Sequence, residues 1–489
     1  MPRPKATKSI RRVTLGRTLP LALAAALLAC SDGGLRPQPD LDAGSPRCGD
    51  GRIDPGEQCD GSNLAGNSCT GLGFDRGTVT CDDQCHLVTA ACLRLCGNGQ
   101  LDPGEACDGT IGPLTCPDWG FKVCTPQCRV DALHCRTTPF RIGVPVGQAH
   151  GGPAIVTDLV PAGYGELVIP DPQFTQLQIY RYEIAGGFLP GSPISRFDGV
   201  VPSVPFAADL DGDGRMDLAA INEDGSADRY RYVPPGEALP DGGAPVNFPR
   251  YALQHLPVPS LDGGAPSPMF AWLGVARLGA GGAADLAALA RDAVLIHPGG
   301  PIPTAAEVLT QPEVVSGALA DFNADGIVDL LLAGPVGQLT VRYGPDFVDG
   351  QTLVLPAPAL RIAAADLDGD GRADVVISTP DAVRILQNTE SGLVEPLSGI
   401  PAAARDLAVR DLDLDGRPDL IWLEDGRVEI RRNLGSFTFA RYAVPTGTGI
   451  PLSLALGDFE GDGDLDIAAT VVQSPGVATI THVLENLVR

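Results

Sequence analysis

The sequence predicts an all-β fold: a seven-bladed β-propeller preceded by two small disulfide-rich modules. Residues 139–489 repeat an Asp- and Gly-rich motif seven times, and short apolar runs flank each copy. Twelve of the 13 cysteines fall into two sets of six between residues 48 and 135. Several short strands per repeat are typical of propeller blades, and units with so many cysteines depend on disulfides because their cores are small.

The first segment, residues 1–29, has the pattern of a signal peptide. Six basic residues and no acidic ones precede an apolar run over residues 19–29, which is too short to span a bilayer. The run ends in Leu-Leu-Ala followed by Cys30, which resembles the lipobox of bacterial lipoproteins. The resemblance implies lipidation of Cys30, and an ordinary signal peptide cut nearby is the alternative. Residues 30–47 are rich in Gly, Pro and Asp and read as a flexible tether.

Two cysteine-rich units follow, at residues 48–92 and 93–135. Their repeats begin CGDGRIDPGEQCDG and CGNGQLDPGEACDG. The pattern resembles the Myxococcus-type cysteine-rich repeat of bacterial surface proteins, which implies a spacer or stalk. We expect three disulfides per unit, with fifteen pairings open in each. The predicted disulfide cysteines are Cys48, Cys59, Cys69, Cys81, Cys85, Cys92, Cys96, Cys107, Cys116, Cys124, Cys128 and Cys135.

Zinc is the alternative for these cysteines. Cys81 and Cys85 are separated by three residues, as are Cys124 and Cys128, and this spacing is within the range of zinc pairs. The two units share no histidine, so disulfides are favoured. Pairing all twelve cysteines also leaves Cys30 as the odd one, in agreement with its lipidation.

The repeated motif of residues 139–489 has five intact and two worn copies. The intact copies are 209–218 (DLDGDGRMDL), 321–330, 366–375, 411–420 and 458–467, and the worn ones are 158–167 and 277–286. An apolar run follows each copy and a second β-rich run comes shortly after, and such runs between Gly, Pro and Asn read as strands. Closure of the ring is expected to hide the first and last strand edges.

The intact loops have the spacing of a calcium site. Acidic residues or Asn stand at positions 1, 3, 5 and 9, position 7 offers a main-chain carbonyl, and the glycines let the backbone curl. Six or seven oxygens at this spacing suit Ca²⁺ better than Mg²⁺. An EF-hand begins in the same way, but it has helices on both sides and a Glu at position 12, where no intact copy here has an acid. Solvated turns without metal are the plain alternative.

We therefore predict about five calcium sites between strands. The predicted ligands are Asp209, Asp211, Asp213, Arg215 and Asp217; Asp321, Asn323, Asp325, Ile327 and Asp329; Asp366, Asp368, Asp370, Arg372 and Asp374; Asp411, Asp413, Asp415, Arg417 and Asp419; and Asp458, Glu460, Asp462, Asp464 and Asp466.

These loops resemble the FG-GAP/VCBS repeats of the integrin α-subunit propeller, in which positions 1, 3, 5, 7 and 9 bind calcium. The resemblance implies the same role for the five intact copies and no metal at the copies beginning at residues 158 and 277. We expect calcium to stabilise each blade before it takes part in any binding of a partner.

Composition and motifs argue against two classes of function, nucleic-acid binding and catalysis. The chain has 35 basic and 60 acidic residues, a balance that argues against nucleic acid as a partner. The six histidines lack metal-ligand spacing, and no G-x-S-x-G, H-E-x-x-H or P-loop motif occurs, so we expect no enzyme. Trp272 and Trp422 are candidates for sugar stacking, with blade packing as the alternative.

The resulting hypothesis is an exported calcium-binding lipoprotein of the bacterial outer membrane or cell surface. It would bind an extracellular protein or a glycan, and it would meet the membrane through its lipid anchor only. Two alternatives remain open. One is a calcium-dependent polysaccharide lyase on a propeller scaffold, and the other is a purely structural envelope protein.

Overall fold

The computed structural model divides into two compact units, Met1–Arg94 and Leu95–Arg489. It describes residues 48–489 except 73, 75, 94–96, 98–100, 102–104, 110–113, 115, 117–118, 138, 149–150, 160–163, 184–186, 197, 239–249, 261–267, 277, 279–283, 291, 311–312, 475–477 and 489. Strands and turns make up the described part, which contains no helix. It follows that none of the described segments is a helix with the length and apolar character to cross a membrane. The predicted lipidation site, Cys30, lies outside the described residues.

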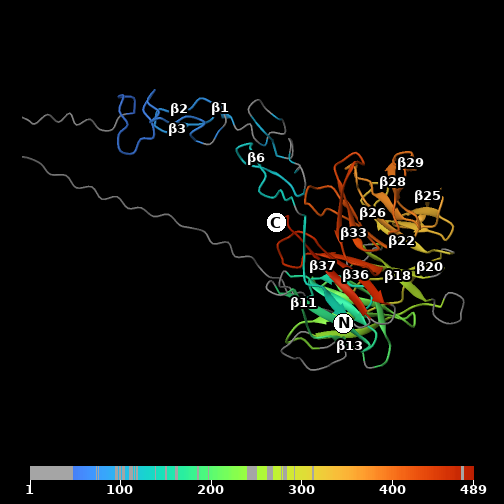
Figure 1. Ribbon diagram of the computed structural model, residues 1–489. Coiled ribbons are helices and arrows are strands. Elements are labelled where there is room, and N and C mark those ends of the chain that lie inside the picture. The colour runs from blue at the N-terminus through green and yellow to red at the C-terminus, as the bar shows by residue number, and fades with distance from the viewer. Residues whose placement is uncertain are drawn as a thin grey trace, which may run out of the picture. The chain divides into compact units, whose positions relative to one another are not determined.

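Seven antiparallel sheets of four or five strands follow one another along the second unit (Figure 1). The prediction of an all-β, seven-bladed propeller is therefore confirmed. Blades 1 to 3 are β9 (Ile155–Thr157), β10 (Glu166–Asp171), β11 (Gln176–Glu183), β12 (Gly187–Pro190) and β13 (Ile194–Ser195); β14 (Pro202–Ala208), β15 (Asp217–Asn222), β16 (Ala227–Val233) and β17 (Arg250–Leu256); and β18 (Met269–Ala276), β19 (Asp285–Ala290), β20 (Ala293–His297) and β21 (Glu307–Thr310).

The remaining blades have the same order of strands. Blades 4 to 6 are β22 (Ser316–Ala320), β23 (Asp329–Ala333), β24 (Gln338–Tyr343) and β25 (Val348–Val354); β26 (Arg361–Ala365), β27 (Asp374–Ser378), β28 (Ala382–Thr389), β29 (Gly392–Val394) and β30 (Ile400–Pro401); and β31 (Asp406–Arg410), β32 (Asp419–Glu424), β33 (Arg427–Asn433) and β34 (Phe439–Pro445). Blade 7 contains β35 (Ile450–Gly457), β36 (Asp466–Ser474) and β37 (Ala478–Asn486).

Blade 7 closes the ring with strands from the beginning of the propeller. β7 (Phe140–Ile142) and β8 (Val146–Gln148) both pair antiparallel with β37. Leu484 pairs with Ile142, so the two ends of the propeller share one sheet. This confirms the expected closure, because the last β37 edge is covered by backbone hydrogen bonds and not left open.

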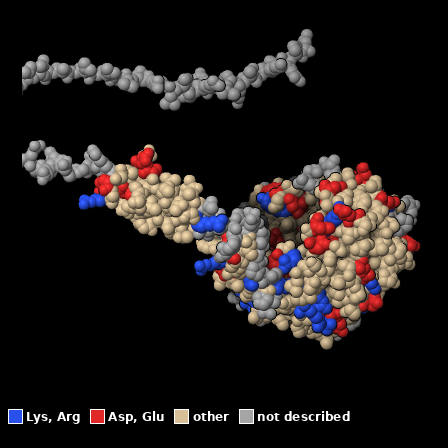
Figure 2. Space-filling model, turned by 90° about the horizontal axis from the view of Figure 1, so that it is seen from above, with Lys and Arg blue, Asp and Glu red and all other residues tan. Residues whose placement is uncertain are grey.

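The first strands of blades 2 to 7, and the residues just before β9 in blade 1, line a central channel. The second strand is the most deeply buried part of a blade. β19, β23, β27 and β32 are buried at every residue, as expected for the apolar runs that follow the repeated motif. The channel has a volume of about 630 Å³ and is lined mainly by apolar side chains, Trp272 among them, together with the charged residues Arg361, Asp406 and Arg410. Acidic and basic side chains are scattered over the propeller surface in Figure 2, most of which is formed by other residues.

Buried asparagines join neighbouring blades in the second half of the ring. Asn433 in blade 6 donates to the carbonyl of Leu367 in blade 5 at 2.8 Å, and Asn486 in blade 7 donates to Leu412 in blade 6 at 2.7 Å. Asn388 in blade 5 makes the same bond to Phe322 in blade 4. Each amide also bonds to a carbonyl in its own blade, so it holds two loops together.

The first cysteine-rich unit is held by disulfides with little apolar core. Its bonds are Cys48–Cys85, Cys59–Cys81 and Cys69–Cys92. Its short strands are β1 (Arg76–Gly77), β2 (Thr80–Cys81), β3 (Leu87–Val88) and β4 (Cys92–Leu93). Cys48, Cys81 and Cys85 lie close enough to hold a metal, but all three are bridged, and a bridged sulfur is not a thiolate ligand.

The second cysteine-rich unit, which contains β5 (Val123–Cys124) and β6 (Val130–Asp131), repeats this pairing. Its described bonds are Cys107–Cys124 and Cys116–Cys135, and Cys128 is also bridged. Cys96, the counterpart of Cys48, lies outside the described residues.

A buried aspartate supports both of these units. Asp60 is 2% exposed and accepts backbone N–H groups of Gly49 at 2.6 Å and Gly51 at 3.0 Å. Asp108 is equally buried and accepts the N–H of Gly97. The repeated Cys-Asp-Gly in the sequence therefore marks a carboxylate that folds the first turn of each unit.

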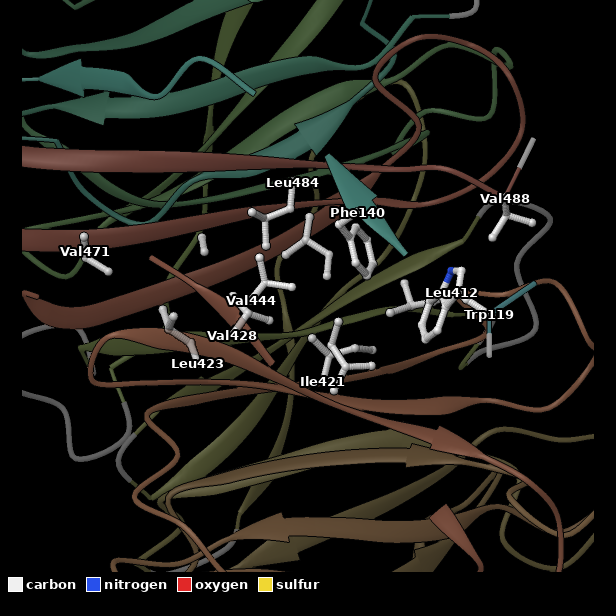
Figure 3. Close-up of a cluster of buried hydrophobic side chains, with 13 residues drawn as sticks. Trp119, Phe140, Leu412, Ile421, Leu423, Val428, Val444, Val471, Leu484 and Val488 are labelled. Atoms are coloured by element: carbon white, nitrogen blue, oxygen red, sulfur yellow. The ribbon is translucent and has the colours of Figure 1, made fainter. Parts of the chain in front are cut away.

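The second cysteine-rich unit packs directly against the propeller, within the same compact unit (Figure 3). Trp119 is fully buried among side chains of blades 6 and 7 and the closing strand β7. Its ring lies 5.1 Å from Tyr442 and 5.6 Å from Phe140, and its Nε1 donates to Oδ1 of Asn486 at 3.0 Å. The expectation of a separate spacer does not fit this unit, because an indole buried in the propeller core fixes it in place.

Candidate cation-binding loops

The seven copies of the repeated motif occupy equivalent places, one in each blade. Each is the connection between the first and second strands, and position 9 is the first residue of the second strand. The intact loops therefore lie between strands, as predicted. Loops 209–217, 321–329, 366–374, 411–419 and 458–466 are all described.

Position 1 of each intact loop organises the backbone around its carboxylate. Asp366 accepts N–H groups from Gly369 at 2.7 Å, Asp370 at 3.2 Å and Gly371 at 2.8 Å. Gly369 and Gly371 have φ values of 83° and 86°, in the left-handed region that favours glycine. The backbone curls round the first carboxylate in this way.

Position 9 has a structural role that the sequence pattern did not reveal. One oxygen of Asp374 accepts the N–H of Leu367 at 2.9 Å, and the other accepts the N–H of Asn388 on the third strand at 2.7 Å. The equivalent bonds occur at Asp329, Asp419 and Asp466. This acid therefore ties the loop to both the second and third strands of its blade.

The two worn copies keep this acid although they have lost most of the others. In blade 3, Asp285 accepts the N–H of Leu278 at 2.9 Å and that of Gly299 at 3.1 Å. In blade 1, Glu166 accepts the N–H of Leu159 at 2.8 Å. Retention at blades without the other predicted ligands indicates that the position-9 acid serves the fold first. The sequence contains a signal for this role, because an acid stands at position 9 in all seven copies, including the two that lack most of the other predicted ligands.

Three loops bring acidic oxygens close enough to share a cation. One ligand atom from each of three carboxylates lies within 4.8 Å of the others in each of these sets: Asp209, Asp211 and Asp213; Asp366, Asp368 and Asp374; and Asp411, Asp413 and Asp419. Carboxylate oxygens are the ligands that hard divalent cations prefer, and each can accept an N–H and a cation together. Several acidic clusters of this protein could therefore hold metal ions.

Loops 321–329 and 458–466 make the same backbone bonds but do not bring three described acidic groups this close. In the first, position 3 is Asn323, whose amide donates to Asp325 at 2.9 Å. In the second, the carboxylate of Asp464 at position 7 is buried and accepts the N–H of Val488 at 3.1 Å. The main-chain ligands predicted at position 7 of all five loops stay a prediction.

The loops differ most in what faces the carboxylate at position 3. Asp211 in blade 2 pairs with Arg231 at 2.6 Å and Arg229 at 3.6 Å. Asp413 in blade 6 pairs with Arg432. Asp368 in blade 5 pairs with no arginine among the described residues and accepts neutral donors, the side-chain amide of Gln387 at 2.8 Å and the backbone N–H of Asp370 at 3.3 Å. Blades 2 and 6 thus offset part of their loop charge with a guanidinium, whereas blade 5 does not.

Burial raises the pKa values of several loop carboxyls. Loss of solvent raises the pKa of Asp217 to about 7 and that of Asp374 to about 6, against the opposing effect of backbone hydrogen bonds. The pKa of Asp329 is raised for the same reason. Neighbouring loop carboxylates add to these increases, because like charges disfavour ionisation.

The two tryptophans noted in the sequence have different environments. Trp422 is 1% exposed in the core between blades 5 and 6, with the Arg431 guanidinium 5.2 Å from its ring centre. Blade packing accounts for it. Trp272 lines the channel and donates from Nε1 to the carbonyl of Val204 at 2.9 Å.

The structural role of position 9 leads to a first prediction. Asp285→Ala leaves two backbone N–H groups without this acceptor, so we expect the free energy of unfolding to fall by roughly 2–4 kcal/mol. The loss should be equal in calcium and in EDTA, as measured by urea denaturation. Asp368→Asn is the matched variant, for which we expect little change in EDTA. A neutral Asp285→Ala variant would contradict the structural role.

The raised pKa values give a second prediction, for the metal-free protein. Between about pH 4 and pH 7 the folded chain holds protons on Asp217 and Asp374 that the unfolded chain has already released, so stability falls as the pH rises. We expect the melting temperature in EDTA to decrease from pH 5 to pH 7.5. An increase over that range would show that other groups dominate.

Comparison with known proteins agrees with this architecture. The model of the FG-GAP-like repeat matches residues 321–404 and 411–469, which include four of the five intact loops. No curated protein matches the chain.

Among solved structures, BBS1N in complex with ARL6DN, soaked with lead, has a TM-score of 0.51 at 15% identity and covers 71% of this chain and 97% of that chain. The mercury-soaked form gives 0.48 at 16%, with 71% and 98% covered. An Agrocybe aegerita lectin described as recognising non-reducing terminal N-acetylglucosamine gives 0.43 at 18%, with 76% and 94% covered. Such identities show similarity of fold alone. The chain is a seven-bladed β-propeller protein that is similar to the FG-GAP-like repeat over residues 321–404 and 411–469.

Proposed function

We propose that this protein is an exported, calcium-stabilised binding module of the bacterial cell surface. The observation that carries the proposal is the set of three loops, each with three carboxylates within 4.8 Å, on one type of strand connection. Left without a cation, such carboxylates repel one another, so calcium would stabilise the blades. Disulfides in both N-terminal units agree with export to an oxidising compartment.

The loop of blade 5 is the strongest calcium site in this proposal. Its carboxylates have the least compensation by arginine, and positions 3 to 6 are exposed to solvent, so an ion can reach them. Asp368 and Asp374 would supply oxygens together with Asp366. Affinities on the order of 10⁻⁴–10⁻³ M are expected, as in other extracellular modules.

Binding of a partner is the function that the propeller supports best in this proposal. Propellers of this type present a wide loop-covered face on a rigid ring, and function resides in such faces and not in the fold itself. The partner in this proposal is an extracellular protein or glycan. Lipidation of Cys30 would keep the module at the membrane and rests on the sequence motif.

The proposal predicts a calcium-dependent stability. EDTA should lower the melting temperature and added calcium should restore it, with the metal confirmed by elemental analysis. Asp368→Asn should reduce the number of ions bound, because it removes one carboxylate from the least compensated loop. The matched control is Asp425→Asn, at an exposed turn outside the loops, which should behave as the parent protein does. Absence of metal together with no thermal shift would refute calcium binding.

A polysaccharide lyase is the second candidate, because of a histidine–aspartate pair in blade 2. Nδ1 of His255 lies 2.6 Å from Oδ1 of the buried Asp228, while the His255 side chain is 73% exposed. Arg196 pairs with the same aspartate. Asp228 would orient His255 as the base that proton abstraction from an acidic sugar requires, whereas Arg196, whose side chain is 2% exposed, would hold Asp228 in place and not contact the sugar. The test is a screen on acidic polysaccharides: unsaturated product that disappears in His255→Ala would favour the lyase, and no product would favour the binding module.

A further inference from the structure

Arg432 stands between the blade-6 loop and the second cysteine-rich unit. It is 1% exposed, and its two terminal nitrogens donate to the carbonyls of Cys116 and Gly120, each at 3.1 Å. The same guanidinium pairs with Asp413 and lies 3.6 Å from Asp415. The buried guanidinium thus joins two carbonyl groups of the second cysteine-rich unit to two carboxylates of the blade-6 loop.

The rest of the contact holds these carbonyls beside the loop. Trp119 is fully buried and bonded to Asn486, as described above. The disulfide Cys116–Cys135 and the paired backbone of Trp119 and Arg136 fix the segment that carries both carbonyls. Arg432 therefore meets preorganised acceptors and loses little freedom when it bonds to them.

The blade-6 loop beside Arg432 also offers carboxylate oxygens to a second cation. Asp413 is fully buried, and its Oδ1 has no hydrogen-bond partner among the described residues. Asp413 belongs to the cluster with Asp411 and Asp419, in which one carboxylate oxygen from each residue lies within 4.8 Å of the others. A buried carboxylate oxygen without a donor is costly, and a cation in the cluster would satisfy it.

We propose that a divalent cation in the blade-6 loop and the docked cysteine-rich unit compete through Arg432. This inference rests on the proposed function, because it assigns a regulatory role to one of the proposed calcium loops. Occupation of the cluster places a second positive charge on Asp413 and repels the guanidinium. Arg432 then bonds less well to Asp413 and no longer holds its guanidinium in place against the carbonyls of Cys116 and Gly120. The second cysteine-rich unit is therefore released from the propeller face.

The coupling is reciprocal. If calcium weakens docking by a given factor, docking weakens calcium binding at this loop by the same factor, for which roughly five- to 150-fold is the usual range. Blade 2 offers a natural comparison. Arg231 pairs with Asp211 at the same loop position, but its other ion-pair partner among the described residues is Glu237 of its own blade.

The test is hydroxyl-radical footprinting of the full chain by mass spectrometry, with and without calcium. Oxidation of Trp119 reports undocking, because the side chain is fully buried when the unit is docked. Trp422, buried inside the blades at 1% exposure, is the internal control. We expect saturating calcium to raise Trp119 oxidation roughly fivefold or more and to leave Trp422 unchanged. Amide exchange of the loops, measured in parallel, reports calcium binding at each site.

Three variants separate the causes. In Asp413→Asn the cation site is impaired while the bonds of Arg432 to Cys116 and Gly120 remain, so Trp119 should stay protected in calcium. In Arg432→Met, calcium should bind the blade-6 loop about tenfold more tightly and should no longer affect Trp119. Arg231→Met removes the equivalent charge in blade 2 and should leave the response of Trp119 as in the parent.

The outcomes distinguish this proposal from the one on which it rests. If loop 366–374 gains protection in calcium while Trp119 does not respond, competition is overturned and calcium binding stands. A Trp119 response that persists in Asp413→Asn also overturns the competition. If no loop responds to calcium, the proposed function itself fails. Should Arg432→Met not fold, Asp413→Asn alone decides the question.

Discussion

The propeller depends on one carboxylate in each blade, the acid at position 9. At Asp374 and its counterparts it accepts a backbone N–H from its own loop and another from the third strand. A backbone N–H buried without an acceptor is costly, and this acid removes that cost at two places in five of the blades, those of Asp285, Asp329, Asp374, Asp419 and Asp466. Even the worn copy in blade 3 keeps this acid, as Asp285, which indicates that every blade needs it for its fold.

The position-9 acid also adds negative charge to its loop, and other groups must offset that charge. A buried acid at position 9 lies beside the acids of positions 1, 3 and 5, and burial together with repulsion from these neighbours raises the pKa of the position-9 acid, as at Asp217. Backbone N–H groups offset part of this charge in every intact loop. The remainder is met by arginine at Asp211 and Asp413, and by no charged partner at Asp368. Blade 5 is therefore the place where a cation contributes most.

Much of the fold could be predicted from the sequence, because it depends on local patterns that recur. The spacing of the motif indicated seven blades, and the apolar run after each copy became a fully buried second strand such as β27. The candidate loops were found in the same way. The double use of position 9 was missed, because its partner Asn388 lies on another strand and a spacing pattern contains no tertiary hydrogen bonds. The bonds of Trp119 and Arg432 escaped for the same reason, since each joins residues more than 300 positions apart.

The second cysteine-rich unit is docked on the propeller, and it and Arg432 depend on each other. Its disulfides supply rigidity that a unit with so small a core lacks, and that rigidity allows two of its carbonyls to serve as acceptors for a buried arginine. An arginine at this position without these carbonyls would leave its donors unsatisfied beside the loop. The covering unit and Arg432 therefore depend on each other, whereas Arg231 in blade 2 needs no cover because Glu237 and Asp211 of its own blade bind it. A unit that the sequence alone assigns to a stalk is thus a structural part of blade 6 and of the closure at blade 7.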